Sequence, residues 1–219
     1  MPYIGYFQLI NIIDKFVIYD DVNYIKKGWI NRNNIILNKQ KQLFTISLSG
    51  ASQNKLINEI EISDNLGKFI KTLQSNYQKA TYYLQTIELI NKIVLFENRN
   101  LSLFIKNSLE IILDYLDITT EILLSSDLNK NNELKGQHKI MAICKELNAN
   151  TYINPIGGID LYDKNYFNKN GIDLFFIKSS CQPYNQFSTE FVPSLSIIDV
   201  LMHNSPDRIN QMMNDFVLL

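Results

Sequence analysis

The sequence predicts an α/β protein built around a parallel sheet, and three observations support this prediction. Short runs rich in β-branched and aromatic residues alternate with longer segments in which apolar residues recur every three or four positions. Polar or glycine-rich segments follow several of these runs. No linker, repeat or low-complexity tract divides the 219 residues. We therefore expect a single α/β domain over 1–219, with a mostly parallel Rossmann-like sheet and a helical insertion at roughly 65–116.

A helix and then a buried strand open the chain. The apolar residues of 5–13 share one helical face, and the run at 15–19 (KFVIY) is short, β-branched and aromatic. Asp20 and Asp21 follow this strand directly, at the edge where open α/β sheets bind ligands. Adjacent strand residues face opposite sides, so we expect one carboxylate to cap the next loop and the other to face a ligand.

The loop at 23–34 carries the strongest local sign of ligand binding. An arginine fork and lysine ammonium groups suit phosphate, and a tryptophan or tyrosine ring suits a base or a pyranose. A solvated basic turn anchored by its tryptophan is the alternative, and we favour the binding interpretation. The binding residues predicted here are Tyr24, Lys27, Trp29, Asn31, Arg32 and Asn33.

The middle of the chain changes from strands to helices. The segment 35–48 resembles a hairpin with its turn at 39–42, and a short strand is expected at 57–62. From 65 to 116 the apolar spacing is helical and no proline interrupts it, which predicts two or three packed helices.

The C-terminal half returns to alternating strands and helices. Strands are expected at 121–124, 151–153 and 172–178, and helices at 136–147, at 195–202 and shortly after it. The segment 160–170 is expected to be a short helix or an ordered loop. Right-handed crossovers bring the carboxyl ends of parallel strands to one edge, so the loops after Tyr19, Ile153 and Lys178 should converge on one cleft.

Several residues near that edge are further candidates. Asn154 follows a strand, and Gly157 and Gly158 could let backbone N–H groups approach a phosphate, although a tight turn explains them equally well. Tyr184 and Gln186 are neutral donors. Asp199 lies among apolar residues, so an inward-facing carboxylate needs a donor such as Arg32 or a hydroxyl. It is then either a structural contact or a site residue.

Composition excludes several classes of protein. Twenty-one Lys and Arg against 22 Asp and Glu give a net charge of -1, which provides no electrostatic attraction to DNA or to an anionic membrane. No apolar run approaches the ~20 residues of a transmembrane helix. Cys144 and Cys181 lack metal-ligand spacing, and a cysteine nucleophile paired with a histidine is disfavoured. We expect a cytoplasmic protein without a bound metal.

Five segments together resemble one known family. They are PYIGYFQLINIIDKFVIYDDVNYIKKGWINRNNI, LFTISL, LLSSDL, KGQHKIMAICKELNANTYINPIGG and PYNQFSTEFVPSLSIIDVLMHN. They look like the WbqC-like proteins of bacterial O-antigen and other surface-polysaccharide gene clusters. The resemblance implies that the protein functions together with sugar-nucleotide enzymes and acyl carrier systems. Members usually begin with a strand ahead of the segment matching 2–6, so this sequence is expected to lack that strand.

The resemblance and the loop chemistry together suggest an enzyme of surface-glycan biosynthesis. It would modify a nucleotide-linked amino sugar by N-acyl or aminoacyl transfer, using an acyl or aminoacyl donor, with an acyl carrier protein or other glycan enzymes as partners. Asp20 or Asp21 would accept the amine proton, and Tyr184 is the third catalytic candidate. Lys27 and Arg32 would bind the diphosphate. The remaining binding residues are Tyr6, Tyr24, Trp29, Asn31, Asn33, Asn154, Gly157, Gly158, Gln186 and Asp199.

Two other functions compete with this one. The layout around Ile4, Gly5 and Tyr6 is similar to the opening of nucleotidylyltransferases, although their His-x-Gly-His signature is absent. A degenerate nucleotidylyltransferase is therefore the second hypothesis. The third is a non-catalytic scaffold that binds sugar-nucleotide enzymes or their acyl carrier.

Overall fold

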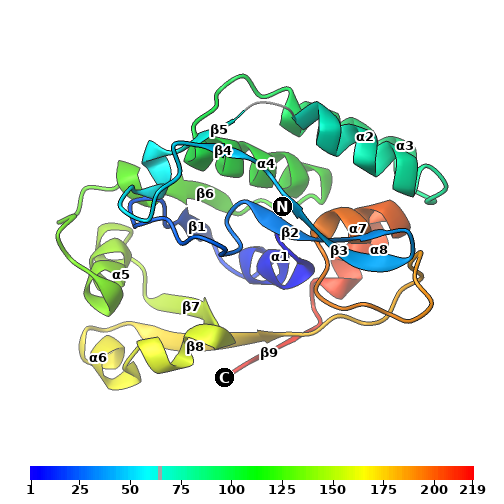
Figure 1. The fold of residues 1–219 in the computed structure, drawn as a ribbon. Helices are drawn as coiled ribbons and strands as arrows, with labels where there is room; N and C mark the ends of the chain where they lie inside the picture. The colour runs from blue at the N-terminus through cyan, green and yellow to red at the C-terminus, as the bar shows by residue number, and fades with distance from the viewer. Residues whose placement is uncertain (64–65) are drawn as a thin grey trace.

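The N-terminal helix leads directly into the first strand and ties both to the C-terminal part of the chain. The computed structural model describes residues 1–63 and 66–219, with α1 at Ile4–Asn11 and β1 at Lys15–Ile18 (Figure 1). The fully buried side-chain amide of Gln8 donates toward three backbone carbonyls, those of Ser180 (2.8 Å), Met212 (2.8 Å) and Asp215 (3.0 Å). These contacts satisfy a buried donor and fix α1 against distant segments.

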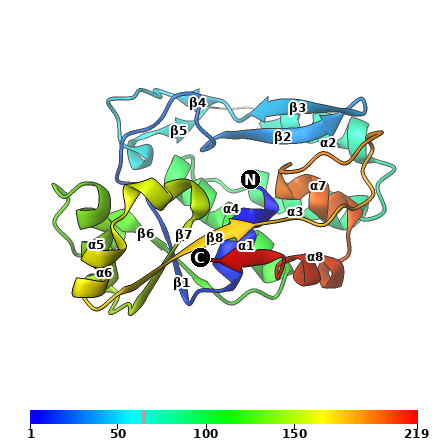
Figure 2. The same cartoon turned by 90° about the horizontal axis from the view of Figure 1, so that it is seen from below.

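Two short parallel units stand where one large sheet was expected. β1 pairs in parallel with β6 (Glu121–Leu124), and β7 (Thr151–Pro155) pairs in parallel with β8 (Asp173–Ser179). β9 (Phe216–Leu218), which the sequence pattern did not indicate, adds antiparallel to β8. Among the strands of the described residues, β1 and β7 are not hydrogen-bonded to each other (Figure 2). The α/β class is confirmed, but a continuous Rossmann-like sheet is not observed, because a cavity separates these two strands.

The predicted hairpin is present with its turn two residues earlier than expected. β2 (Arg32–Leu37) and β3 (Gln40–Thr45) are antiparallel, and the two turn residues Asn38 and Lys39 have φ angles of 51° and 62°. Two consecutive positive φ angles are typical of a type I′ turn, which matches the twist of a hairpin. Lys39 is in the turn as predicted, but Gln40, Lys41 and Gln42 belong to β3, an exposed strand that tolerates polar residues.

A smaller antiparallel pair follows the hairpin. β4 (Leu48–Ser49) pairs with β5 (Glu61–Ile62), and the 3-10 helix η1 (Ile57–Glu59) precedes β5. Of the strand expected at 57–62, residues 57–59 are therefore a helical turn and only 61–62 are strand.

Three helices form the expected helical layer. They are α2 (Leu66–Tyr77), α3 (Tyr83–Val94) and α4 (Leu101–Tyr115), which pack in sequence against one another (Figure 1). The predicted first residue of the layer, Asn65, lies outside the described residues. Asn100 begins α4, where its side chain accepts hydrogen bonds from the backbone N–H groups of Ser102 and Leu103.

The remaining helices cover the two strand units from other sides. α5 (Gly136–Glu146) and α6 (Lys164–Lys169) form a small core with β8, centred on the fully buried Phe167. α7 (Ile197–His203) and α8 (Pro206–Met212) join the main core of α1, β1, β6 and the helical layer. The 3-10 helices η2 (Ser125–Asp127) and η3 (Ile156–Leu161) follow β6 and β7. Within the described part of the chain, every helix is too short or too polar to cross a bilayer.

Candidate functional site

Asp20 caps the loop after β6. Its side chain is fully buried; Oδ1 accepts a hydrogen bond from the backbone N–H of Ser126 at 3.0 Å, and Oδ2 accepts one from the Ser126 hydroxyl at 2.7 Å. Since both carboxylate oxygens have protein donors, Asp20 has a structural role. It caps the loop after β6, however, and not the loop directly after β1 that the sequence indicated.

Asp21 is the centre of a buried ion cluster. Its Oδ2 lies 2.8 Å from the Nζ of Lys130 and 2.9 Å from the Nζ of Lys139, and the three side chains are 7%, 1% and 3% exposed, respectively. Lys139 also donates to the backbone carbonyl of Asp21 at 2.9 Å, and Lys130 donates to that of Ser125. Burial raises the pKa of Asp21, but the two lysines and Ser125 outweigh it and hold that pKa below its usual value.

A group of tyrosines continues this cluster toward β7. The Nζ of Lys139 lies 5.3 Å from the ring centroid of Tyr19, and burial together with Asp21 raises the pKa of Tyr19 to about 12. The Tyr152 hydroxyl donates to the Asn154 side chain at 3.0 Å, and the Tyr152 and Tyr162 rings meet edge to face at 5.6 Å. Tyr19, Tyr152, Asn154 and Tyr162 all line one cavity.

That cavity lies between β1 and β7 and has a volume of about 670 Å³. Its lining includes the unbroken runs 12–17 and 147–155. Because alternate strand residues face opposite sides, an unbroken run means that the edges of the strands line the space. Most lining side chains are apolar, and Tyr6 of the predicted set is among them. The cavity therefore extends along both strands to Tyr19 and Pro155 at their carboxyl ends, and Lys139 lies behind the Tyr19 ring without lining the cavity.

The loop before β2 divides into structural and exposed residues. Tyr24 is buried and donates to the Asn31 side chain at 3.0 Å, and Asn31 donates to the carbonyl of Ile46 at 2.7 Å. Asn33, also buried, donates to the carbonyl of Met1 at 2.9 Å. These three predicted binding residues hold the loop in place.

The other three predicted binding residues of this loop remain accessible. Trp29 is 66% exposed, so it is not an anchor in the core. The Arg32 guanidinium lies 5.5 Å from the centroid of its ring, and Arg32 Nε donates to the carbonyl of Gly28 at 2.7 Å. Lys27 is exposed at a positive φ of 61°. Neither the cavity beside β1 nor the second one described below is lined by these residues.

Close packing against other side chains explains why Gly158 and Gly5 lack a side chain, but it does not explain Gly157. A Cβ on Gly158 would lie 2.1 Å from Asn154 Nδ2, whereas one on Gly157 would meet nothing within 4 Å. A Cβ on Gly5 would lie 2.4 Å from the ring of Tyr3 and 2.5 Å from the Ser179 hydroxyl. The protein's own side chains therefore fill the space in front of Gly5, where the nucleotidylyltransferase layout needs room for a phosphate.

A third buried carboxylate, that of Asp199, stands on α7 and faces α2. Asp199 is fully buried; the Tyr77 hydroxyl donates to its Oδ2 at 2.6 Å, and the Tyr184 hydroxyl donates to its Oδ1 at 2.7 Å. Hydroxyls rather than Arg32 are thus its donors. Burial raises the pKa of Asp199, and the hydrogen bonds from both tyrosines oppose that rise. The Tyr77 hydroxyl also accepts from the backbone N–H of Ile36 at 2.9 Å.

Gln186 and Tyr184, which were predicted near the acidic pair, belong to this second region. The Gln186 side chain accepts from the backbone N–H of Val192 at 2.8 Å and donates to its carbonyl at 3.1 Å. Tyr77 was missed by the sequence reasoning, because its spacing indicated only a core position. The polar hydroxyl on an otherwise apolar helical face was the available signal.

The two thiols are poor nucleophiles in this environment. Burial raises the pKa of Cys144 and of Cys181 to about 11, so both are protonated at neutral pH. His138 Nδ1 instead lies 3.0 Å from the Tyr166 hydroxyl. The described residues contain no cluster of three or more His, Cys, Asp or Glu side chains suited to a metal ion.

Comparisons with known proteins place the chain in a family. No solved structure matches it. The uncharacterized protein Rv1507c of Mycobacterium tuberculosis is 29% identical over 209 residues, which cover 93% of this chain and 89% of that protein. A family model, that of the WbqC-like protein family, matches residues 1–211. Because that match spans nearly the whole chain, the protein belongs to the WbqC-like protein family.

Proposed function

We propose that this protein is an enzyme of surface-glycan biosynthesis that transfers an acyl or aminoacyl group to the amine of a nucleotide-linked sugar. The cavity between β1 and β7 carries the proposal: it is mostly apolar, and Tyr19, which lines it, lies against Lys139 of the buried cluster of Asp21, Lys130 and Lys139. An apolar space that leads to charged groups suits a donor whose acyl group is apolar and whose carbonyl reacts.

The charged cluster fits the needs of acyl transfer. The sugar amine attacks the donor carbonyl, the new C–N bond forms, the bond to the ester or thioester carrier breaks, and an amine proton goes to the departing oxygen or sulfur. An ammonium group such as that of Lys139 stabilises the negative oxygen of the tetrahedral intermediate. The lowered pKa of Asp21 keeps it ionised, so it orients the amine as a hydrogen-bond acceptor and is a weak base.

Binding of the nucleotide is assigned to the exposed loop before β2. The ring of Trp29 with the Arg32 guanidinium beside it offers a stacking face and a phosphate fork, and Lys27 adds a second charge. Trp29 is the single tryptophan of the chain, so its fluorescence reports on this loop specifically.

Binding of nucleotide-linked amino sugars is the first test. We expect the wild type to gain thermal stability and to change its Trp29 fluorescence on adding UDP- or dTDP-linked amino sugars, since a ligand at about 100 times its Kd adds about 2.7 kcal/mol. Arg32→Ala should lose both responses, and Arg99→Ala, which changes an exposed arginine between α3 and α4, should keep them. The absence of any response in the wild type would argue against the proposal.

Transfer itself is tested with variants that separate the two substrates. Val17→Phe places a larger side chain in the β1–β7 cavity and should abolish acylation detected by mass spectrometry, while nucleotide-sugar binding persists. Val94→Phe, at a partly buried position of α3 outside that cavity, is the control. Equal activity of both variants would exclude the cavity as the acyl site.

A further inference from the structure

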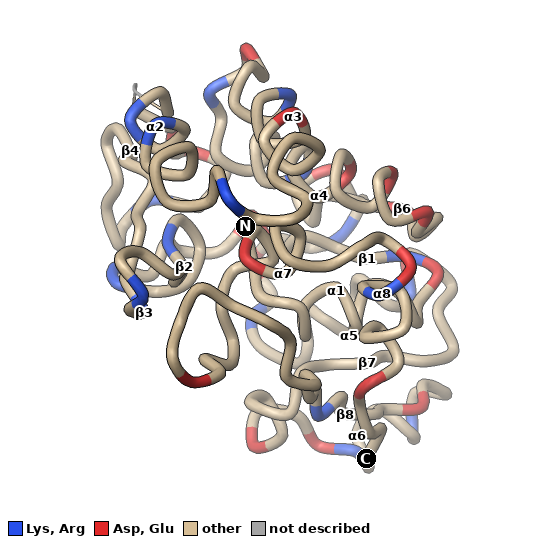
Figure 3. Tube along the Cα trace, turned by 90° about the vertical axis from the view of Figure 1, so that its right-hand side faces the viewer, with Lys and Arg blue, Asp and Glu red and all other residues tan. Residues whose placement is uncertain are grey.

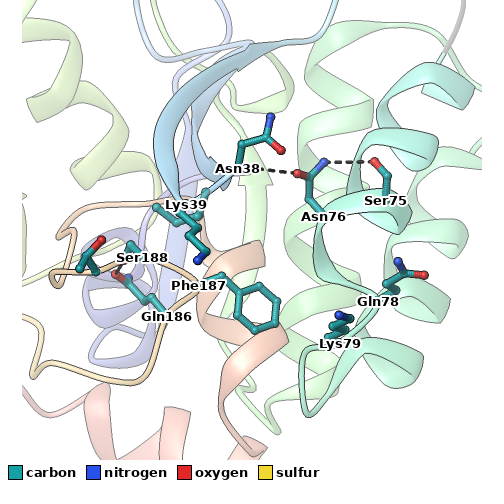
Figure 4. Close-up of a pocket in the computed structure, with 11 residues that line it drawn as sticks. Asn38, Lys39, Ser75, Asn76, Gln78, Lys79, Gln186, Phe187 and Ser188 are labelled. Atoms are coloured by element: carbon teal, nitrogen blue, oxygen red, sulfur yellow. Dashed lines mark hydrogen bonds between the residues drawn. The ribbon is translucent and has the colours of Figure 1, made fainter.

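A second cavity, of about 570 Å³, shares no lining residue with the cavity between β1 and β7. Three segments form it: the β2–β3 turn, the C-terminal end of α2, and residues 186–189 (Figure 4). The acyl-transfer proposal does not use this cavity.

Positive charge lines this cavity without a counter-charge. Lys39 comes from the hairpin turn and Lys79 follows α2, and no aspartate or glutamate lines the space. Neither lysine takes part in an ion pair within residues 1–63 and 66–219. Further lysines stand nearby on β3 (Lys41) and α2 (Lys68 and Lys71), and neither strand nor helix contains an acidic residue (Figure 3). In a chain whose net charge is -1, this arrangement favours an anion.

The other lining groups are those that recognise a carbohydrate. The side chains of Asn38, Asn76 and Gln78 offer amide donors and acceptors, and Phe187 presents a partly buried ring (Figure 4). Asn76 is oriented by its own hydrogen bond to the carbonyl of Thr72 at 2.8 Å. A ring face beside amides is a common arrangement for holding a sugar.

The buried Asp199 network connects the three walls of this cavity. Tyr77, the last residue of α2 and the neighbour of Asn76 and Gln78 in sequence, links Asp199 to the backbone N–H of Ile36 on β2. Tyr184 links Asp199 to the segment that leads to Gln186 and Phe187. Because these hydrogen bonds are buried, the walls are held in place before any ligand arrives.

We infer that this cavity binds a sugar phosphate, with Lys39 and Lys79 contacting the phosphate and the Phe187 ring and neighbouring amides contacting the sugar. The site is independent of the acyl-transfer proposal, because Asp21, Lys139 and the Trp29 loop do not line it; Gln186, which the sequence placed in that reaction, belongs to this cavity instead. Its ligand class combines one anionic group with a hydroxyl-bearing ring.

Calorimetric titration with glucose 1-phosphate tests the inference on the full chain. We expect this probe to bind at least about tenfold more tightly than inorganic phosphate or glucose, since each of those lacks one half of the contacts. Lys39→Gln and Lys79→Gln should each weaken binding about three- to tenfold, in line with charged hydrogen bonds at an exposed site. The paired control Lys41→Gln and Lys71→Gln removes exposed lysines of β3 and α2 that do not line the cavity.

Three results would overturn the inference. They are undetectable binding of glucose 1-phosphate at millimolar concentration, equal affinity for inorganic phosphate, or unchanged affinity in the Lys39→Gln/Lys79→Gln double variant. Circular dichroism of each variant confirms that it folds. The titration contains neither an acyl donor nor a nucleotide-linked sugar, so failure here and failure of the acyl-transfer proposal are distinguishable.

Discussion

Asp21→Asn removes the one carboxylate that two buried ammonium groups share. The side chains of Lys130 and Lys139 are 1% and 3% exposed, so solvent cannot replace the lost charge. Removing one partner of a buried ion pair typically costs about 3–5 kcal/mol, and the retained amide oxygen still accepts one hydrogen bond. We therefore expect the free energy of unfolding to fall by about 3–4 kcal/mol at pH 7.

Urea denaturation followed by circular dichroism measures this loss. Asp114→Asn, at an exposed position on α4, is the matched control and should stay within about 0.5 kcal/mol of the wild type. High salt should change the loss little, because buried pairs are weakly screened.

The pH dependence of the free energy of unfolding provides a second check on the role of Asp21. The folded pKa of Asp21 lies below its unfolded value of 3.8, so its charge contributes stability that is present above pH 3.8 and is lost as the pH falls through the folded pKa. The difference between the wild type and Asp21→Asn should therefore shrink below pH 3.8. A loss under about 1 kcal/mol at pH 7, or one that is constant down to pH 2, would refute the assignment of Asp21 as the counter-charge.

Three further predictions concern other buried contacts. Tyr77→Phe leaves Asp199 without one donor and the N–H of Ile36 without its acceptor, so denaturant titration should show a loss of about 2–4 kcal/mol. The raised pKa of Asp199 means that its carboxyl keeps a proton in the native state that the unfolded chain releases, so its contribution to the free energy of unfolding falls as the pH rises above 3.8. In unfolding titrations from pH 4 to 8, the free energy of unfolding of Asp199→Asn should therefore rise relative to that of the wild type. A constant difference between the two would contradict this. Gly158→Ala forces a methyl group against a side chain and should cost about 1–3 kcal/mol, whereas Gly157→Ala, with open space around it, should cost far less; equal melting temperatures for the two variants would contradict the packing explanation.

Local patterns predicted the elements better than they predicted the partners of polar side chains. The acidic pair was correctly expected at the end of β1, because a β-branched run followed by two aspartates is visible in a short window. The partners of Asp21 were not predicted, since Lys130 and Lys139 lie more than a hundred positions away and have no distinctive spacing. Only the fold brings these charges together.

The boundaries that were wrong have equally specific causes. β3 was assigned in part to a turn because its exposed residues are polar, although an exposed strand needs no apolar face. β9 is too short and too exposed to produce a periodic signal, and it exists because β8 offers an edge. The gap between β1 and β7 also has no local signature, because whether two strands pair depends on the packing around them.

The contacts of α1 and β1 affect the order in which the chain can fold during synthesis. Asp20 finds its donors 106 positions later at Ser126, and Gln8 finds an acceptor 207 positions later at Asp215. Closing such long loops is entropically costly, and folding slows as contacts become more distant in sequence. α1 leaves the ribosome long before these partners do, so its apolar face stays exposed to chaperones until the C-terminal segments emerge.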